Sequence, residues 1–141
     1  MSEILQVLKL NTNAKLPTRA HPGDAGIDLY SLTDGILVPN APIKIQTGIA
    51  MSIPHGFAGM ICDRSSMGAK GIRVLGGIVD SEYRGEVQVL LINLGTAELA
   101  IKKGDKIAQM LVLPVNLCTV SEVSSLSDTA RSDSGFGSSG R

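Results

Sequence analysis

The chain has 141 residues, of which 43% are hydrophobic, and this is enough apolar material to bury the core of one ordinary domain. Its 13 basic and 13 acidic residues cancel, so neither nucleic acid nor a membrane surface is expected as a partner. No stretch approaches the roughly 20 apolar residues that span a bilayer, and the first residues lack the pattern of a signal peptide. Any charged ligand must therefore be met by a local site.

The two cysteines, Cys62 and Cys118, lie in apolar stretches and lack the spacing of a metal site. We expect both to be buried thiols in a reducing compartment. The protein is accordingly expected in the cytoplasm, or in the nucleus if its source is eukaryotic or viral.

Short apolar runs separated by glycine, proline and asparagine predict an all-β fold. The expected strands are residues 4–10, 43–53, 57–62, 76–80, 86–94, 106–114 and 116–120. In 43–53 the apolar residues alternate with polar ones, which is the pattern of one half-buried strand. Residues 65–71 could form a helical turn, capped by Ser65 or Ser66. Many short strands and little helix indicate a sandwich or barrel.

The composition changes near Ser121, after which serine, glycine, aspartate and threonine dominate. We expect a β domain over residues 1–120 and a flexible segment over 121–141, because so polar a segment does not pack a core. Phe136 stands out in this tail, since its aromatic ring has no core to join.

The stretch GGIVDSEYRGEV, residues 76–87, predicts two strands joined as a hairpin, with Asp80 at the end of the first arm and Tyr83 at the tip. Asp80 either starts the turn by bonding its own backbone or serves as a general base, because a carboxylate at a strand end is well held. The residues alone leave both interpretations open.

Three other stretches hold polar groups beside apolar ones. Arg64, Ser65 and Ser66 follow an expected strand and stand at a possible helix start, where a guanidinium, hydroxyls and free N–H groups suit a phosphate. A capped turn with a solvated arginine is the alternative. Asp28 lies between small and apolar residues, where a buried carboxylate needs partners or a cation. Gln109 interrupts an apolar strand, so it faces either solvent or a ligand.

Taken in order, the stretches AGIDLYS, DRSS, GGIVDSEYRGEV, GDKIAQM and RSDSGFGSSG resemble the five motifs of the homotrimeric dUTPase family, from about residue 17 to the end of the chain. The resemblance implies a distorted jelly-roll, or β-clip, subunit and a homotrimer with its sites at the subunit interfaces. It also implies hydrolysis of dUTP to dUMP and pyrophosphate with Mg²⁺, which limits uracil in DNA and supplies dUMP for dTTP synthesis.

The resemblance also implies a role for each candidate residue. Asp80 matches the family's general base, which activates the water that attacks the α-phosphorus. Tyr83 matches the residue that lies against the deoxyribose and excludes UTP. The backbone that reads uracil corresponds to Gly77, Ile78, Val79 and Gln88. The phosphate-contacting positions correspond to Arg64, Ser65, Ser66 and Gln109. Asp28 matches the aspartate that holds Mg²⁺ through its water shell.

The same resemblance accounts for the tail. In the family a mobile arm closes over the bound nucleotide, with an arginine on the γ-phosphate and a phenylalanine stacked on uracil. Arg131 and Phe136 match these two positions. Gly137, Ser138 and Ser139 match the part of the arm whose backbone approaches the phosphates.

Several residues depart from the family's commoner pattern. Ser132 and Ser134 replace glycines of the arm, which is expected to alter its closure. Asp63 precedes Arg64 where glycine or proline is more frequent, and it either brings a negative charge near the phosphates or pairs with Arg64. Lys106 stands in place of an arginine.

Two other functions fit parts of the pattern. The related dCTP deaminases share the fold and the phosphate site, but they lack the hairpin with Tyr83 over the sugar and use a glutamate base instead of Asp80. A non-catalytic trimer that binds dUTP as a signal, or presents a surface to a protein partner, is the alternative from a different class. Release of pyrophosphate separates dUTP hydrolysis from this second alternative, and release of ammonia identifies a deaminase.

Overall fold

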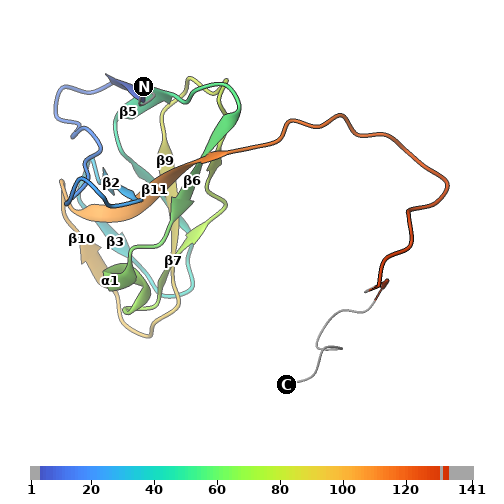
Figure 1. Ribbon diagram of the computed structural model, residues 1–141. Coiled ribbons are helices and arrows are strands. Elements are labelled where there is room, and N and C mark those ends of the chain that lie inside the picture. Colours follow the sequence, from blue (N-terminus) through green and yellow to red (C-terminus); the bar gives the residue numbers. More distant parts are fainter. Residues whose placement is uncertain (1–3, 131, 134–141) are drawn as a thin grey trace.

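The computed structural model describes residues 4–130 and 132–133 of the chain (Figure 1). The all-β, jelly-roll-like architecture expected from the sequence is confirmed. In chain order, the elements of the described residues are β1 (Gln6–Lys9), β2 (Ile27–Tyr30), β3 (Gly35–Leu37), β4 (Ile43–Gln46), β5 (Ile49–Ser52), β6 (Phe57–Cys62), α1 (Ser65–Gly68), β7 (Ile72–Leu75), β8 (Ile78–Val79), β9 (Gln88–Asn93), β10 (Leu99–Ile101) and β11 (Lys106–Pro114). None of the helices in this part of the chain is long and apolar enough to cross a membrane.

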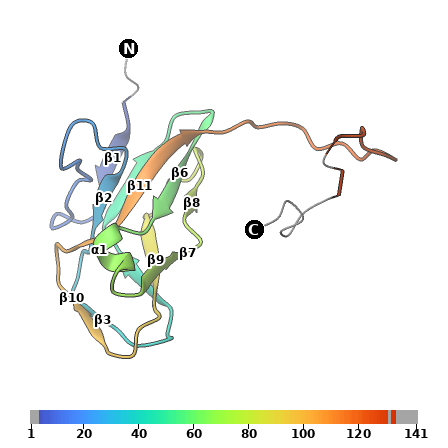
Figure 2. The same ribbon diagram turned by 60° about the horizontal axis from the view of Figure 1, so that its bottom comes forward.

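The strands pair antiparallel in sheets whose neighbours are far apart in sequence. The largest sheet has the order β2-β11-β6-β8, and Figure 2 shows these strands side by side in that order. A three-stranded sheet has the order β4-β9-β7, while β1 pairs with β5 and β3 pairs with β10. The buried faces meet in one hydrophobic cluster, in which Leu29, Val89, Ile107 and Met110 are fully buried.

The segment 43–53 forms two strands, so the prediction of one continuous strand was wrong. Gly48, between β4 and β5, has a φ of 70°, a backbone conformation that favours glycine and interrupts an extended strand. β4 then pairs with β9, whereas β5 pairs with β1 in a different sheet. The chain therefore changes sheets at a position where the side-chain alternation alone gives no sign of a break.

The predicted hairpin at 76–87 was also wrong, although both of its strands exist. β8 pairs with β6, and β9 lies between β4 and β7, so both edges of β9 are already occupied. The N–H of Tyr83 donates to the C=O of Asp80 over 3.1 Å and closes a turn between the two strands. This turn carries the chain from one sheet to the other.

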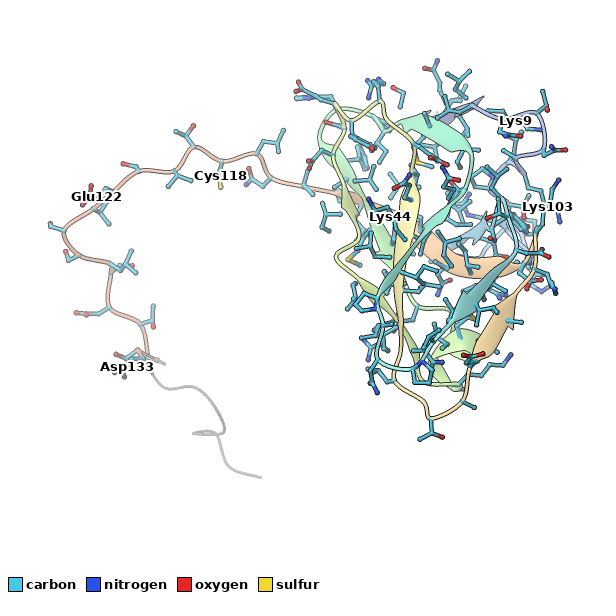
Figure 3. The ribbon with its side chains drawn as sticks, turned by 180° about the vertical axis from the view of Figure 1, so that it is seen from behind. Lys9, Lys44, Lys103, Cys118, Glu122 and Asp133 are labelled. Atoms are coloured by element: carbon cyan, nitrogen blue, oxygen red, sulfur yellow. The ribbon has the colours of Figure 1, made fainter. Side chains whose placement is uncertain are left out.

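After β11 the described chain leaves the body of the molecule as an extended segment, the orange and red part of Figure 1. The strand predicted at 116–120 was wrong: this segment is extended but, among the described residues, it pairs with no strand. Figure 3 shows Cys118 and Glu122 on this segment, away from the sheets. Cys118 is exposed and Cys62 is only partly buried, so the expectation that both thiols are buried was wrong. Val120 on the same segment is 94% exposed. The division into residues 1–120 and 121–141 stays a prediction.

Candidate active site

The residues singled out in the sequence fall into two separate pockets. The first, called here the β8 pocket, is lined by Gly77, Ile78, Val79, Asp80, Tyr83 and Gln88 together with apolar side chains. The second, called here the α1 pocket, is lined by Asp28, Arg64, Ser65, Ser66 and Gln109 among others. The two linings share no residue, and α1 lies on the β2 and β11 side of the large sheet while β8 is its opposite edge (Figure 2).

Asp80 directly follows β8, so the strand holds its side chain at the β8 pocket. The turn after it is closed by the C=O of Asp80 and not by its carboxylate. Within residues 4–130 and 132–133, no hydrogen bond or ion pair holds this exposed carboxylate. The side chain is therefore not consumed by the turn, and it can accept a proton from a molecule in the pocket.

Tyr83 lies over the same turn. Its hydroxyl donates to the C=O of Glu86 over 3.0 Å, which fixes the direction of a ring that is 47% exposed. The ring thus forms a fixed wall at the mouth of the β8 pocket. A ligand group that would occupy the volume of this wall is excluded by contact.

Glu86 and Lys44 also line the β8 pocket, and neither was predicted from the sequence. The Glu86 carboxylate accepts the N–H of Gly48 over 2.8 Å and the Gln88 side-chain amide over 3.0 Å. The backbone of Gly48, where the chain changes sheets, thus holds the Glu86 carboxylate, and this carboxylate orients the Gln88 amide. No sequence signal marks the contact with Gly48, since the two residues are 38 positions apart. Lys44 is one of the polar residues that alternate with apolar ones in 43–53, and the packing of β4 beside β9 brings it to the pocket.

In the α1 pocket, a buried carboxylate fixes Arg64. The Arg64 Nε donates to Asp28 Oδ1 over 3.0 Å, and its Nη1 donates to the C=O of Lys106 over 3.3 Å. The Lys106 ammonium lies 2.6 Å from Asp28 Oδ2. Asp28 is only 9% exposed, and a buried carboxylate needs charged partners. Arg64 and Lys106 are these partners. The hydrogen bond to Asp28 also raises the pKa of Lys106 above its ordinary value.

The two serines of the α1 pocket do not cap the helix, so that prediction was wrong. α1 begins at Ser65 itself, Arg64 occupies the N-cap position, and no side chain makes a capping hydrogen bond. Both serines are exposed at the pocket. Their hydroxyls and the N–H groups of the first turn can therefore meet an anion there.

Asp63 pairs with Arg73 and not with Arg64, so the expected pairing with Arg64 was wrong, and its side chain does not line the α1 pocket. Its Oδ2 lies 2.5 Å from the Arg73 Nε, and its Oδ1 accepts the N–H of Val74 over 2.6 Å. The side chain thus faces β7. The guanidinium of Arg73 on that strand pairs with the negative charge, which therefore lies outside the lining of the α1 pocket.

The residues of the α1 pocket fit a metal ion only as partners of its water shell. Among the described residues, no group of three or more His, Cys, Asp or Glu side chains could hold a metal directly. Both carboxylate oxygens of Asp28 already form ion pairs with side chains, one with Arg64 and the other with Lys106. A small cation such as Mg²⁺ keeps several waters and is bound largely through phosphate oxygens, so this set of donors suits it when a phosphate is present.

Arg131, Phe136, Gly137, Ser138 and Ser139 lie outside the described residues. Their expected contacts with a nucleotide stay predictions. Ser132, at the edge of this region, has a φ of 47°, a value that favours glycine and that a serine adopts at some cost.

Known proteins resemble this chain over nearly its whole length. A family model described as dUTPase matches residues 12–140. The deoxyuridine 5'-triphosphate nucleotidohydrolase of Mycolicibacterium vanbaalenii is 48% identical, over 99% of this chain and 97% of the relative. The protein of the same name from Corynebacterium glutamicum is 40% identical, over 97% and 95%.

Solved structures agree with the sequence relatives. A dUTPase variant of Staphylococcus bacteriophage 80alpha, determined with dUpNHpp, superposes with a TM-score of 0.94 at 28% identity and covers 99% of this chain and 100% of its own. A dUTPase variant from phage phi11 of S. aureus, which coordinates a structural Mg(II) ion, has a TM-score of 0.82 at 27% identity and covers 87% and 98%. On the family match and the identity of its relatives, the chain belongs to the dUTPase family.

Proposed function

We propose that this protein hydrolyses dUTP to dUMP and pyrophosphate, and that Asp80 activates the attacking water. The observation that carries the proposal is the exposed Asp80 carboxylate, which stands at a pocket with an apolar wall and a strand-edge backbone. The relatives of 48% and 40% identity bear the name of this activity. The reaction removes dUTP, which limits uracil in DNA, and supplies dUMP for dTTP synthesis. Two free cysteines fit a cytoplasmic enzyme.

The β8 pocket is the proposed site for the uracil ring and the sugar. Ile78 and Val79 belong to a two-residue strand that pairs on one side with β6, so its other side is an open edge with backbone donors and acceptors. A fixed pattern of donors and acceptors accepts uracil and rejects cytosine, because the wrong base leaves buried polar groups unpaired. The amide of Gln88, oriented by Glu86, adds a further polar group to this pattern.

The α1 pocket is the proposed site for the phosphate chain. The guanidinium of Arg64, two serine hydroxyls and the amide of Gln109 converge there. Charge-assisted hydrogen bonds from these groups would hold the phosphates and stabilise the charge that develops on them. A bound Mg²⁺ supplies further neutralisation of the phosphate oxygens, and Asp28 would contact it through water.

The proposed reaction is an in-line displacement at the α-phosphorus. Asp80 takes a proton from water as the water oxygen forms a bond to the α-phosphorus. The bond from this phosphorus to the bridging oxygen breaks, and pyrophosphate leaves with the electron pair. The residues of the pockets supply position and charge stabilisation, which provide most of the catalysis in phosphoryl transfer.

Because the two pockets share no lining residue, we propose that one active site combines the β8 pocket of one copy with the α1 pocket of another. A closed homotrimer meets this requirement with three equal sites. The segment after β11, which extends away from its own body, would then lie against neighbouring copies and bring residues 121–141 over a site.

Replacing Tyr83 by alanine is expected to reduce the preference for dUTP over UTP by about 10- to 100-fold, because the ring no longer fills the space of a ribose 2′-hydroxyl. The measurement is the ratio of kcat/KM for the two nucleotides. Tyr83→Phe is the matched control, since it keeps the ring and loses only the hydrogen bond to Glu86. Unchanged discrimination in Tyr83→Ala would show that another group excludes the hydroxyl.

Deleting residues 131–141 is expected to lower kcat/KM for dUTP by about 100-fold, since closure of the arm completes the site and excludes water. The fold should survive, because the buried apolar residues of the described chain lie between Ala14 and Met110. Calorimetry of the truncated chain checks the second point. A large loss of Tm would mean that the tail is structural.

The proposed function is tested by measuring pyrophosphate release from dUTP, dCTP, dTTP and UTP in parallel, with Mg²⁺ and with a chelator. We expect release from dUTP alone, weakened by the chelator. Ammonia release from dCTP would identify a deaminase. Tight dUTP binding without any product would favour the signalling trimer.

A further inference from the structure

Asp63 contacts three parts of the molecule at once. It stands between Cys62, the last residue of β6, and Arg64, the first residue of the α1 pocket to follow it. Its carboxylate binds β7, as described above, and its C=O accepts a hydrogen bond from the Gln109 side chain. It thereby links the sheet that contains β6 to the sheet that contains β7.

The carboxylate of Asp63 anchors this segment firmly. β7 is an edge strand of its sheet. The N–H of Val74 points away from β9 and donates to the Asp63 carboxylate. The Arg73 side chain on the same strand pairs with the second oxygen. A carboxylate that accepts a backbone N–H and also pairs with a guanidinium makes two charge-assisted contacts, which are stronger than neutral ones.

The C=O of Asp63 orients the amide of Gln109. The Gln109 Nε2 donates to this carbonyl over 2.8 Å. An acceptor at that place determines which end of the amide carries nitrogen. The Gln109 Oε1 lies where a Cβ on Gly26 would be, 2.1 Å from that ideal position, so only glycine leaves room for it. One N–H of the amide donates to Asp63, and among the described residues the second N–H has no hydrogen-bond partner, so it is available to the α1 pocket that Gln109 lines.

We propose that Asp63 is a positioning residue for phosphate binding, which acts through Gln109 and through the adjoining Arg64. By fixing residue 63 to β7, its carboxylate places the carbonyl that orients Gln109 and the backbone from which Arg64 extends. The proposal deepens the proposed function and rests on it. It requires that loss of the Asp63 carboxylate weakens binding of the phosphate chain and leaves binding of the base and sugar unchanged.

The test compares the binding of dUpNHpp and dUMP by calorimetry in the full chain with Mg²⁺. Asp63→Ala is expected to weaken dUpNHpp by about 10-fold or more, in line with the loss of charged hydrogen bonds, and to change dUMP affinity by less than about 2-fold. Asp63→Asn, which keeps an acceptor for the Val74 N–H, should recover most of the affinity. The matched control is Asp34→Ala, since Asp34 likewise accepts a backbone N–H and pairs with a lysine but lines neither pocket.

A double-mutant cycle separates positioning from general support of the fold. In a Gln109→Ala background, Asp63→Ala should weaken dUpNHpp less than it does in the wild type, because part of its effect passes through Gln109. Equal loss of dUMP and dUpNHpp affinity, or full additivity in the cycle, would overturn the proposal. Wild-type protein that binds neither nucleotide would instead contradict the proposed function itself.

Discussion

Replacing Asp80 by asparagine is expected to lower the turnover of dUTP by about 100- to 10,000-fold, the range in which a general base contributes to catalysis. Asparagine has nearly the same shape but cannot take a proton from water. Since no hydrogen bond or ion pair within the described residues holds the Asp80 carboxylate, its loss should not disturb the turn that the backbone closes. The affinity for dUpNHpp should therefore remain within about 3-fold of the wild type.

The measurement is single-turnover hydrolysis, because it separates the chemical step from binding and product release. Glu82→Gln is the matched control: it removes an exposed carboxylate from the same turn, but Glu82 does not line the β8 pocket. Its rate should equal that of the wild type. If Asp80→Asn turned over dUTP at the wild-type rate, another group would have to be the base.

The second large effect is a gain of activity on mixing two inactive variants. Asp80→Asn disables the β8 pocket, and Arg64→Gln disables the α1 pocket. If each site takes one pocket from each of two copies, an equal mixture of the two chains leaves about one quarter of the sites with both pockets intact. Trimers that contain both chains have one intact site in three, so they should show about a third of the wild-type activity, while each variant alone is nearly inactive.

Co-expression of the two variants with different affinity tags, followed by purification on both, provides trimers that contain both chains. The control is each variant co-expressed with a second, differently tagged copy of the same variant and purified in the same way. No gain in the mixed trimers would place both pockets of a site in one chain. A monomeric molecular mass in solution would also contradict the proposed assembly.

Some elements could be predicted because their signal is local. β6 and β11 have the bounds that their apolar runs and flanking turns indicate. The break at Gly48 could not be predicted, since the side chains alternate through it and only the backbone φ of 70° interrupts the strand. The strand pairs of β8 and β9 were wrong for a similar reason: the pattern marks a strand, but its partner depends on which edges are already filled.

In the candidate site, too, features with a local sequence signal could be predicted and contacts between distant residues could not. Residue types and order were enough to gather Asp80 and Tyr83 in one pocket and Arg64 in the other. The partners that orient Arg64 and Gln109 could not be predicted, because these contacts join residues distant in sequence. Asp28 and Arg64 are 36 residues apart, and the Gln109 amide and the Asp63 carbonyl are 46 residues apart. A single sequence carries no signal for such pairs.

Hydrolysis of dUTP in water labelled with ¹⁸O, followed by mass spectrometry of both products, shows directly which phosphorus the water attacks. Water activated by Asp80 and directed at the α-phosphorus places the label in the phosphate of dUMP and leaves pyrophosphate unlabelled. Label in pyrophosphate would mean that the β-phosphorus is attacked, and it would contradict the proposed role of Asp80 at the β8 pocket.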